Sequence, residues 1–235
     1  MTARVLVRSE RQGGVMLLLP NPPENAMSRL LPKHFRDVVI SLAVLGGPFL
    51  MASDKHPRVT LLPLGVVPAA TLNSIITELP KALPVDASIG VARGIPEMTR
   101  SKYRPSRYRA DDLLEFLSTL PEAKEAHVLG LLEADISCTK GDFPDWGIFG
   151  LGFCPGPTAV VSTFRLKRNV GAEKRIFRIV CTAIHETGHM LGLRHCEEPR
   201  CVMLDAEGSI NNTDTSTGQL GPGCRAVLVA KFGEW

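Results

Sequence analysis

The sequence predicts an α/β fold in which helices cover a mixed β-sheet. Short apolar runs of strand length, the clearest at residues 59–64 and 127–132, alternate with longer segments in which apolar residues recur every three or four positions. The first pattern is typical of buried strands and the second of amphipathic helices. The elements follow in the order strand, helix, strand, helix, strands and helix, which favours a sandwich of helices on a mixed sheet.

Each element has its own local signal. Apolar residues at 72, 75, 76 and 79 have helical spacing, and Pro80 is expected to end that helix because proline disrupts the helical hydrogen bonds. Acidic residues at 111 and 112 favour the start of a helix whose inward residues would be Leu113, Leu114, Leu117 and Leu120. The expected strands span residues 59–64, 85–91, 127–132, 147–153 and 158–164, and the last helix spans residues 173–191.

Residues 58–235 are expected to form one domain, preceded by an extension of uncertain order at residues 1–57. Prolines at 20, 22 and 23 interrupt the extension, and its periodicity is poor. Met51 is a candidate internal start of translation, because the recognisable pattern begins soon after it. Alternatively, the basic residues before the apolar run at 38–51 loosely resemble a secretory signal peptide, although the Gly46-Gly47-Pro48 break argues against that interpretation.

Composition excludes several classes of protein. The chain has 235 residues, of which 44% are hydrophobic and 22% are charged, as is usual for a soluble globular protein. The net charge of +3 gives no reason to expect binding to nucleic acid or to an anionic membrane. Basic clusters at 100–109 and 165–178 are interpreted as solvated surface. No run reaches the roughly 20 apolar residues that span a bilayer. We expect a monomer without nucleic-acid or membrane partners.

The most informative segment is His185-Glu186-Thr187-Gly188-His189-Met190-Leu191-Gly192-Leu193-Arg194-His195, which has the pattern HExxHxxGxxH. On a helix, His185 and His189 lie one turn apart on the same face. Both imidazoles can then reach one ion at about 2.0–2.1 Å. Gly192 lacks a Cβ, so it can take a left-handed conformation, end the helix and bring His195 back as a third ligand.

The acidic residue of this segment suits a catalytic role. Glu186 is adjacent to the first histidine, so its carboxylate would point beside the metal, where a general base for a metal-bound water is needed. Three protein ligands leave a fourth position open for water, which is typical of a catalytic zinc rather than a structural one. The alternative is an ordinary amphipathic helix with two surface histidines. Gly192 and His195, at the offsets of the metzincin signature, argue against it.

Met203 and the neighbouring cysteines extend the pattern. Met203 follows His195 at a spacing that suits a turn forming an apolar floor under the histidines, although a lone methionine is more often ordinary core packing. Cys196 follows His195 directly, and Cys201 lies just before Val202 and Met203. The combined pattern HExxHxxGxxH-C-x4-C-x-M resembles that of the archaemetzincins, a family of zinc peptidases.

The resemblance implies a second, structural zinc, but this chain departs from the family pattern there. In the family a C-x-x-C pair follows the methionine, and four cysteines bind that zinc. This chain has Cys224 at the second position of the pair and Gly221 at the first. Cys196, Cys201 and Cys224 would form an incomplete site, because structural zinc prefers four ligands. The fourth ligand stays open among Asp205, a water and the thiols of Cys138, Cys154 and Cys181, and a site without metal is an equal alternative.

The resemblance also implies a fold and an activity. The fold would be a metzincin-like zincin domain: a mixed, mostly parallel twisted sheet with an antiparallel edge strand, an active-site helix and a small C-terminal subdomain. The activity would be that of a zinc metallopeptidase, which hydrolyses peptide bonds with a zinc-bound water and Glu186 as general base. The strand expected at residues 147–153 occupies the place of the edge strand. Gly150, Leu151 and Gly152 are therefore candidates for pairing with an extended peptide substrate.

Two further features bear on activity and location. Some metzincins place a tyrosine two residues beyond the methionine to stabilise the oxyanion, but this chain has Asp205 there. Activity is therefore expected to be low or confined to few substrates. Six cysteines in a chain of this length do not indicate a disulfide framework, which favours a reducing, cytoplasmic location. His34, His56 and His127 have no partner at ligand spacing.

A non-catalytic, zinc-stabilised peptide-binding module is the main alternative function. Asp205 and Gly221 leave it open, whereas the intact Glu186 argues against it. A secreted matrix-type metzincin is the second alternative, and the free cysteines argue against that one.

Overall fold

The computed structural model describes residues 56–206 and 208–235. Apart from residues 56 and 57, the expectations about an N-terminal extension, an internal start at Met51 and a signal-like segment lie outside these ranges. None of the helices within them combines the length and the apolar character that a membrane span needs.

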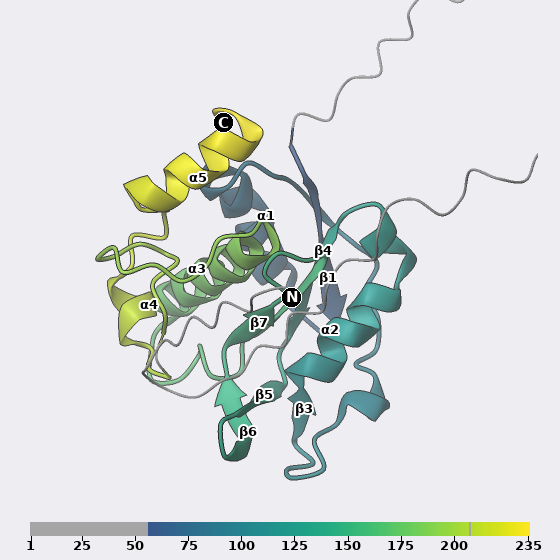
Figure 1. The fold of residues 1–235 in the computed structure, drawn as a ribbon. Helices are drawn as coiled ribbons and strands as arrows, with labels where there is room; N and C mark the ends of the chain where they lie inside the picture. Colours follow the sequence, from purple (N-terminus) through teal and green to yellow (C-terminus); the bar gives the residue numbers. More distant parts are fainter. Residues whose placement is uncertain (1–55, 207) are drawn as a thin grey trace, which may run out of the picture. The chain divides into compact units, whose positions relative to one another are not determined.

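A five-stranded sheet forms the centre of the described domain (Figure 1). Its strands, in spatial order, are β2 (Asp86–Ile89), β1 (Arg58–Leu64), β4 (His127–Leu132), β8 (Thr158–Ser162) and β7 (Gly150–Gly152). The first four are parallel, and β7 is antiparallel to β8. The expected mixed, mostly parallel sheet with an antiparallel edge strand is confirmed.

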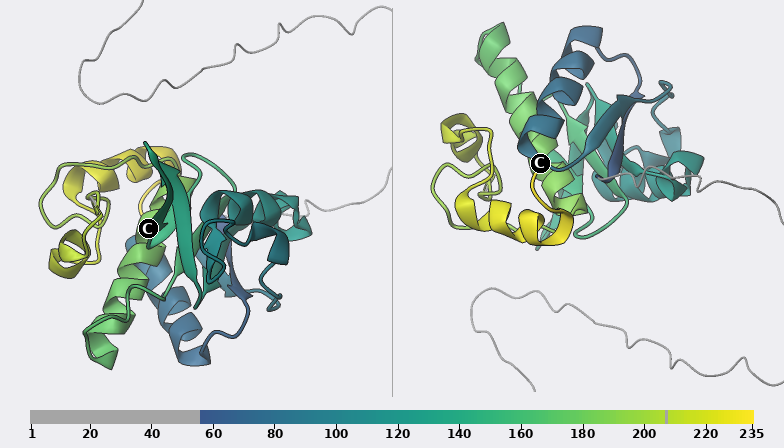
Figure 2. Two further views of the ribbon diagram at one scale, coloured as in Figure 1. Left: turned by 90° about the horizontal axis from the view of Figure 1, so that it is seen from below. Right: turned by 90° about the horizontal axis from the view of Figure 1, so that it is seen from above.

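Helices cover both faces of this sheet (Figure 2). The helices are α1 (Ala69–Ala82), α2 (Ala110–Thr119), α3 (Ala172–Met190), α4 (Asn211–Thr215) and α5 (Pro222–Phe232), with 3-10 turns η1 (Glu97–Thr99) and η2 (Pro121–Lys124). Along β1, Val59 and Leu61 face a core shared with α1 and α3, whereas Leu62 and Leu64 face a second core shared with α2. Strands buried on both faces are apolar along most of their length, which is why the sequence revealed them.

The helices begin and end close to the positions that the sequence predicts. Helix α3 starts and stops one residue before the expected bounds, and α2 carries Asp111 and Asp112 in its first turn. The expectation that Pro80 ends α1 is wrong, because the helix continues to Ala82. A proline in the last turn removes only one hydrogen bond, and the Leu83 N–H still donates to the carbonyl of Leu79 at 2.9 Å.

The structure adds a second sheet that the apolar pattern does not predict. Its strands, in spatial order, are β3 (Arg107–Arg109), β5 (Asp135–Lys140) and β6 (Phe143–Ile148). These strands are short and rich in polar residues, so they lack an apolar run. The expectation of one strand at 147–153 is therefore wrong: β6 ends at Ile148, and β7 begins at Gly150.

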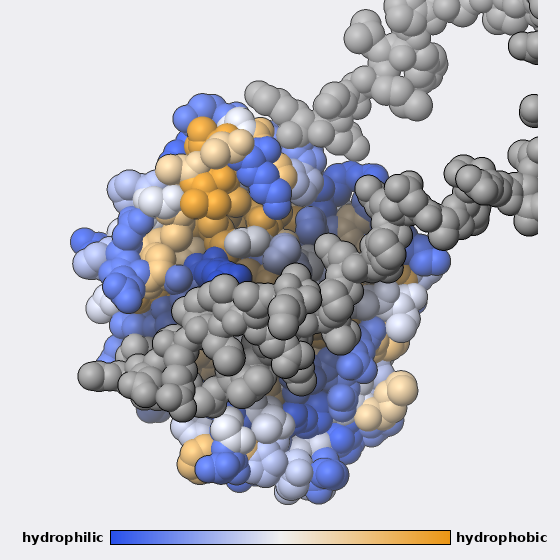
Figure 3. All heavy atoms as spheres, viewed as in Figure 1, coloured by the Kyte–Doolittle hydropathy of each residue, from blue (hydrophilic) through white to orange (hydrophobic). Residues whose placement is uncertain are grey.

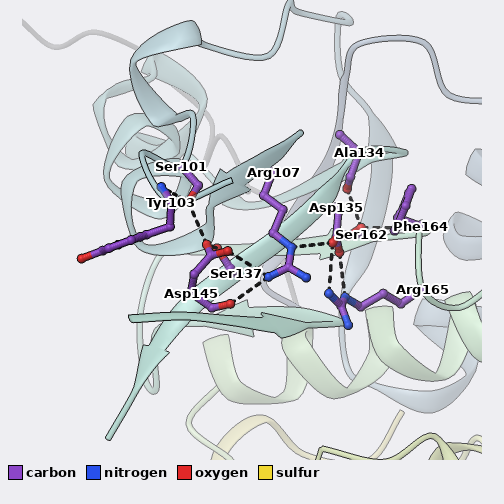
Figure 4. A network of polar contacts seen from close by, with 10 residues as sticks. All are labelled: Ser101, Tyr103, Arg107, Ala134, Asp135, Ser137, Asp145, Ser162, Phe164 and Arg165. Atoms are coloured by element: carbon purple, nitrogen blue, oxygen red, sulfur yellow. Dashed lines mark hydrogen bonds and ion pairs between the residues drawn. The ribbon is translucent and has the colours of Figure 1, made fainter. Parts of the chain in front are cut away.

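Buried ion pairs connect this second sheet to the turn after β8 (Figure 4). Arg107 donates to Asp135 at 2.7 Å and to Asp145 at 2.9 Å, and Arg165 donates to Asp135 at 2.7 Å. The side chains of Arg107 and Asp135 are 9% and 7% exposed, so each charge needs its partner. A Cβ at Gly147 would overlap the guanidinium of Arg165. The arginine is therefore fixed against the backbone of β6.

The C-terminal segment packs back against α3 and forms the small subdomain that was expected. Arg178 of α3 donates two hydrogen bonds to Asp214 of α4, at 2.7 and 2.6 Å. Cys224 and Leu228 of α5 are buried in the core that α1 and α3 share. The exposed surface of α5 carries an apolar patch (Figure 3), and Val227 of this helix is 55% exposed.

Candidate metal centre and active site

The end of helix α3 brings the three histidines of the motif together. The helix stops after Met190, and Gly192 has a φ of 102°, which glycine adopts without strain. The Leu193 N–H donates to the carbonyl of Gly188 at 2.9 Å and closes the turn. The chain then returns toward the helix and places His195 beside its first two histidines. The expected helix end at Gly192 is confirmed.

The Nε2 atoms of the three histidines converge on one point. The separation is 3.0 Å between His185 and His189, and 3.2 Å from His195 to each of the other two. Three nitrogens at about 2.0–2.1 Å from a tetrahedral zinc would lie about 3.3–3.4 Å apart. The rings are thus close to the spacing that ligands of one ion require.

Hydrogen bonds at the other ring nitrogens fix the tautomers of the first two histidines. Nδ1 of His185 lies 2.8 Å from the Val202 carbonyl oxygen, and Nδ1 of His189 lies 2.7 Å from the Leu193 carbonyl oxygen. A carbonyl only accepts, so both Nδ1 atoms carry the hydrogen and both Nε2 atoms present a lone pair. Lone pairs facing each other repel, and a cation between them removes that repulsion. The donor set therefore fits a zinc ion.

The electrostatic environment keeps two of these rings neutral. Burial, followed by the neighbouring His189, lowers the pKa of His185 to about 4. Burial also lowers the pKa of His189. Neutral imidazole is the form that binds metal. His195 is more exposed, and its Nδ1 lies 3.4 Å from a carboxylate oxygen of Asp205.

Glu186 lies beside the histidines and is almost completely buried. Its relative exposure is 6%, and burial raises the pKa of its carboxyl group to about 8. The carboxylate packs against β7: a Cβ at Gly150 would lie 2.5 Å from Oε1, and one at Gly152 would lie 3.4 Å from Oε2. Glycine at position 150 therefore leaves the room that the carboxylate occupies, a role that the sequence did not suggest.

Met203 packs under the helical turn that carries the first two histidines. It is fully buried, and a Cβ at Gly188 would lie 2.5 Å from its Sδ. The Cys196 N–H donates to the carbonyl of Met203 at 3.1 Å, which ties this turn to the residue after His195. The placement agrees with the apolar floor that the sequence predicts.

A cavity of about 370 Å³ opens at the three histidines. This volume lies in the range typical of ligand pockets. Strand β7 borders the cavity, and the segment from Val202 to Ser216 contributes further lining residues. Gly150, Leu151 and Gly152 all line it, as do Glu186 and Asp205. The expected edge strand and the histidine cluster therefore share one cavity.

Three cysteines form a second cluster. The sulfur atoms of Cys196, Cys201 and Cys224 all lie within 4.8 Å of one another. Two of them come from the loop after His195, and Cys224 lies in the first turn of α5. Asp205 lies beside His195 instead. Cys138, Cys154 and Cys181 also lie outside the cluster. None of these four residues therefore belongs to the cysteine cluster.

Sequence reasoning missed Arg165, which lines the cavity. Asp135 fixes its guanidinium through two hydrogen bonds, at 2.7 and 3.0 Å (Figure 4). The only signal was the basic cluster at 165–178, which was interpreted as solvated surface. That interpretation is wrong for the buried Arg178, and the same holds for Arg107 in the cluster at 100–109. A buried arginine is recognisable only once its carboxylate partner is known.

Two further histidines, His56 and His127, lie in the part of the chain that the structure describes. Nδ1 of His127 lies 3.1 Å from the Gly156 carbonyl oxygen, and burial lowers the pKa of this ring. Neither His127 nor His56 belongs to a metal-binding group in the described ranges. His34 lies outside those ranges.

Comparisons with known sequences identify relatives of this chain. Residues 72–229 match the family model of peptidase family M54. The archaemetzincin of Haloquadratum walsbyi is 26% identical over 178 residues, which cover 72% of this chain and 98% of that protein. The archaemetzincin of Methanopyrus kandleri is 38% identical over 109 residues, which cover 46% of this chain and 58% of that protein.

Solved structures give the same result. The crystal structure of the Methanopyrus kandleri archaemetzincin has a TM-score of 0.67 at 27% identity, covering 79% of this chain and 100% of that one. The Archaeoglobus fulgidus archaemetzincin, complexed with malonate, has a TM-score of 0.61 at 28% identity, covering 72% of this chain and 98% of that one. Because the family model matches well over half of the sequence, the chain belongs to peptidase family M54, the archaemetzincins, and is a zinc metallopeptidase.

Proposed function

We propose that His185, His189 and His195 hold the catalytic zinc and that Glu186 is the general base of peptide-bond hydrolysis. The convergence of three Nε2 atoms within 3.0–3.2 Å, beside a buried carboxylate, is the observation that carries this proposal. Zinc, when bound at such a site, lowers the pKa of a coordinated water and polarises the substrate carbonyl.

The chain's own residues supply the proton transfer. Glu186 takes a proton from the attacking water and returns it to the amine of the departing product, so the carboxylate ends in its original state. Burial favours its protonated form, as the raised pKa indicates, and an adjacent dication would favour the carboxylate. Asp205, next to Nδ1 of His195, would orient the third ligand, as carboxylates beside zinc-bound histidines commonly do.

The substrate is proposed to be an extended peptide that pairs with the edge strand β7. This strand is last in the order of the five-stranded sheet, and Gly150, Leu151 and Gly152 line the cavity at the histidines. An edge strand offers main-chain hydrogen bonds to a peptide whatever its side chains are. The backbone of the substrate would then be held next to Glu186, with the scissile carbonyl near the zinc site.

A second zinc is proposed at Cys196, Cys201 and Cys224. Three thiols within 4.8 Å of one another suit a thiolate site, and two of them come from the loop that follows His195. A zinc there would act structurally, because it would tie this loop to α5. The chain would carry two zinc ions, one catalytic and one structural.

We also propose that residues 58–235 make up the peptidase domain. The family match at residues 72–229 lies within these bounds, and β1 begins at Arg58. The monomeric state and the cytoplasmic location stay predictions. Mass spectrometry of the protein from its native source tests the internal start at Met51.

The test of this function compares Glu186→Gln with Glu197→Gln, a matched change at an exposed glutamate. Cleavage of a peptide library should fall by about 10²–10⁴-fold in Glu186→Gln, the range for loss of a general base. Zinc content should equal that of the wild type, and Glu197→Gln should cleave normally. Equal cleavage by both variants would contradict the role of Glu186. Zinc-loaded wild-type protein that binds peptides without cleaving them would favour the peptide-binding alternative.

A further inference from the structure

The carboxylate of Glu198 occupies the space that a side chain at position 221 would need. A Cβ built on Gly221 would overlap Oε2 of Glu198 and would lie 2.9 Å from its Cδ and 3.3 Å from Cβ of Cys201. Position 221 is where this chain lacks the first cysteine of the C-x-x-C pair. A glutamate side chain therefore lies against the position from which the missing thiol would come. Its carboxylate is not within 4.8 Å of all three sulfur atoms, so it would have to turn toward them to join the cluster.

Several hydrogen bonds fix Glu198 in this place. The Gly223 N–H, in the first turn of α5, donates to Oε1 at 2.8 Å. The Cys201 N–H donates to the main-chain carbonyl of Glu198 at 3.2 Å. The Gly221 N–H donates to the sulfur of Cys201 at 3.0 Å. Glu198 is thus bound to both parts of the cysteine cluster, the loop and the helix.

The second oxygen of this carboxylate is available to a ligand. Among the residues that the structure describes, no hydrogen-bond donor reaches Oε2 of Glu198, whereas Oε1 has the Gly223 N–H. Carboxylate oxygens bind zinc at about 2.0–2.2 Å and occur together with thiolates. A carboxylate also carries the charge of a thiolate, so three cysteines and Glu198 would give zinc the same ligand charge as four cysteines.

We propose that Glu198 is the fourth ligand of a zinc bound by Cys196, Cys201 and Cys224, and that its Oε2 replaces the thiolate absent at position 221. The inference rests on the proposed occupancy of the cysteine cluster. It makes the second site a closed, four-ligand site of the structural kind. Because Cys196 directly follows His195, this site would also stabilise the position of the third catalytic ligand.

A helix cap is the competing explanation for Glu198. Its Oε1 already accepts the Gly223 N–H, and a carboxylate at a helix N-terminus is stabilising without any metal. A cap needs only a hydrogen-bond acceptor, whereas zinc ligation needs the anionic oxygen. Glu198→Gln separates the two roles, because its amide oxygen still accepts the hydrogen bond but is a poor zinc ligand.

The test measures the zinc that an organomercurial reagent releases from the full-length protein. The reagent attacks thiolates, so it reports the cysteine-bound ion, and competition with a chromophoric chelator gives the affinity of that ion. The wild type should release one zinc per chain. Glu198→Gln should weaken this affinity by at least about 100-fold, the upper range for disturbing an outer partner of a ligand. Glu197→Gln, at the exposed neighbour, should leave it unchanged.

A rescue variant completes the design. Glu198→Ala combined with Gly221→Cys should restore the wild-type affinity with four thiolates, because the φ of −68° at Gly221 is open to cysteine. If Glu198→Gln does not fold, the double variant decides between the ligand role and the cap role of Glu198. Recovery of folding and zinc binding supports the ligand role, and failure of both overturns it.

The outcomes separate this inference from the proposed second zinc. An unchanged affinity in Glu198→Gln, with one zinc still released, overturns the ligand role and leaves Glu198 as a cap. A wild type that releases no more zinc than the Cys196→Ser/Cys224→Ser variant overturns the occupied cysteine site itself.

Discussion

The contact between Gly150 and Glu186 offers a direct test of the position of the general base. Gly150 has a backbone that alanine can adopt, since it is not among the glycines with positive φ. Its added Cβ would lie 2.5 Å from Oε1 of Glu186, 2.6 Å from Cγ and 2.8 Å from Cδ. Gly150→Ala should therefore push the carboxylate away from β7 without touching any histidine.

The size of the effect follows from these distances. A carbon and a carboxylate oxygen come into contact at about 3.3 Å, so the oxygen must move by roughly 0.8 Å. A misplacement of about 1 Å in a catalytic group costs on the order of 100-fold in rate. We expect kcat/KM for a peptide substrate to fall about 100-fold, which corresponds to roughly 2.7 kcal/mol of transition-state stabilisation.

The assay measures peptide cleavage, zinc content and the midpoint of thermal unfolding for Gly150→Ala and a matched control. Gly94→Ala is that control, because a Cβ there meets nothing within 4 Å. Zinc content should stay at the wild-type value in both variants, and only Gly150→Ala should lose activity. Wild-type activity in Gly150→Ala would refute the position assigned to Glu186. Loss of zinc from the Gly150→Ala variant would show that β7 supports the metal site instead.

Two further predictions concern the supports of the site. Asp214→Asn should lower the free energy of unfolding at pH 7 by about 2–3 kcal/mol, because the buried Arg178 loses its anionic partner. The hydrogen bonds from Arg178 lower the pKa of Asp214, so its stabilisation is complete above the ordinary aspartate pKa of about 3.9 and is lost as the pH falls below it. Urea unfolding should show that the wild type and Asp214→Asn differ less in free energy of unfolding at pH 3 than at pH 7. A difference that does not change with pH would contradict the ion pair. Gly188→Ala should cost about 1–3 kcal/mol against the wild-type Met203, yet stabilise a Met203→Ala background by up to about 1 kcal/mol. If Gly188→Ala changed the free energy of unfolding equally in both backgrounds, the proposed contact between residue 188 and Met203 would be ruled out.

The part of the fold that the sequence predicted is the part whose strands are buried on both faces. Residues 59–64 and 127–132 are mostly apolar because helices cover both sides of β1 and β4. The second sheet escaped prediction because its strands are stabilised by ion pairs such as that between Arg107 and Asp135. Charged residues far apart in the sequence give no periodic signal, so their pairing appears only in the structure.

The same distinction holds at the site. The histidines and Glu186 were predictable because a helix and one glycine turn set their spacing within a single segment. The support of Glu186 by Gly150 and the approach of Glu198 to Gly221 depend on contacts between segments that are distant in sequence. The sequence revealed only that position 221 departs from the family pattern.

An anomalous difference map from crystals grown with zinc, with data on both sides of the zinc absorption edge, tests the histidine site most directly. We predict a peak about 2.0–2.1 Å from Nε2 of His185, His189 and His195, the distance of zinc–imidazole bonds. A map without a peak among these three nitrogens, or with zinc bound to only one of them, would contradict the assignment of the catalytic metal.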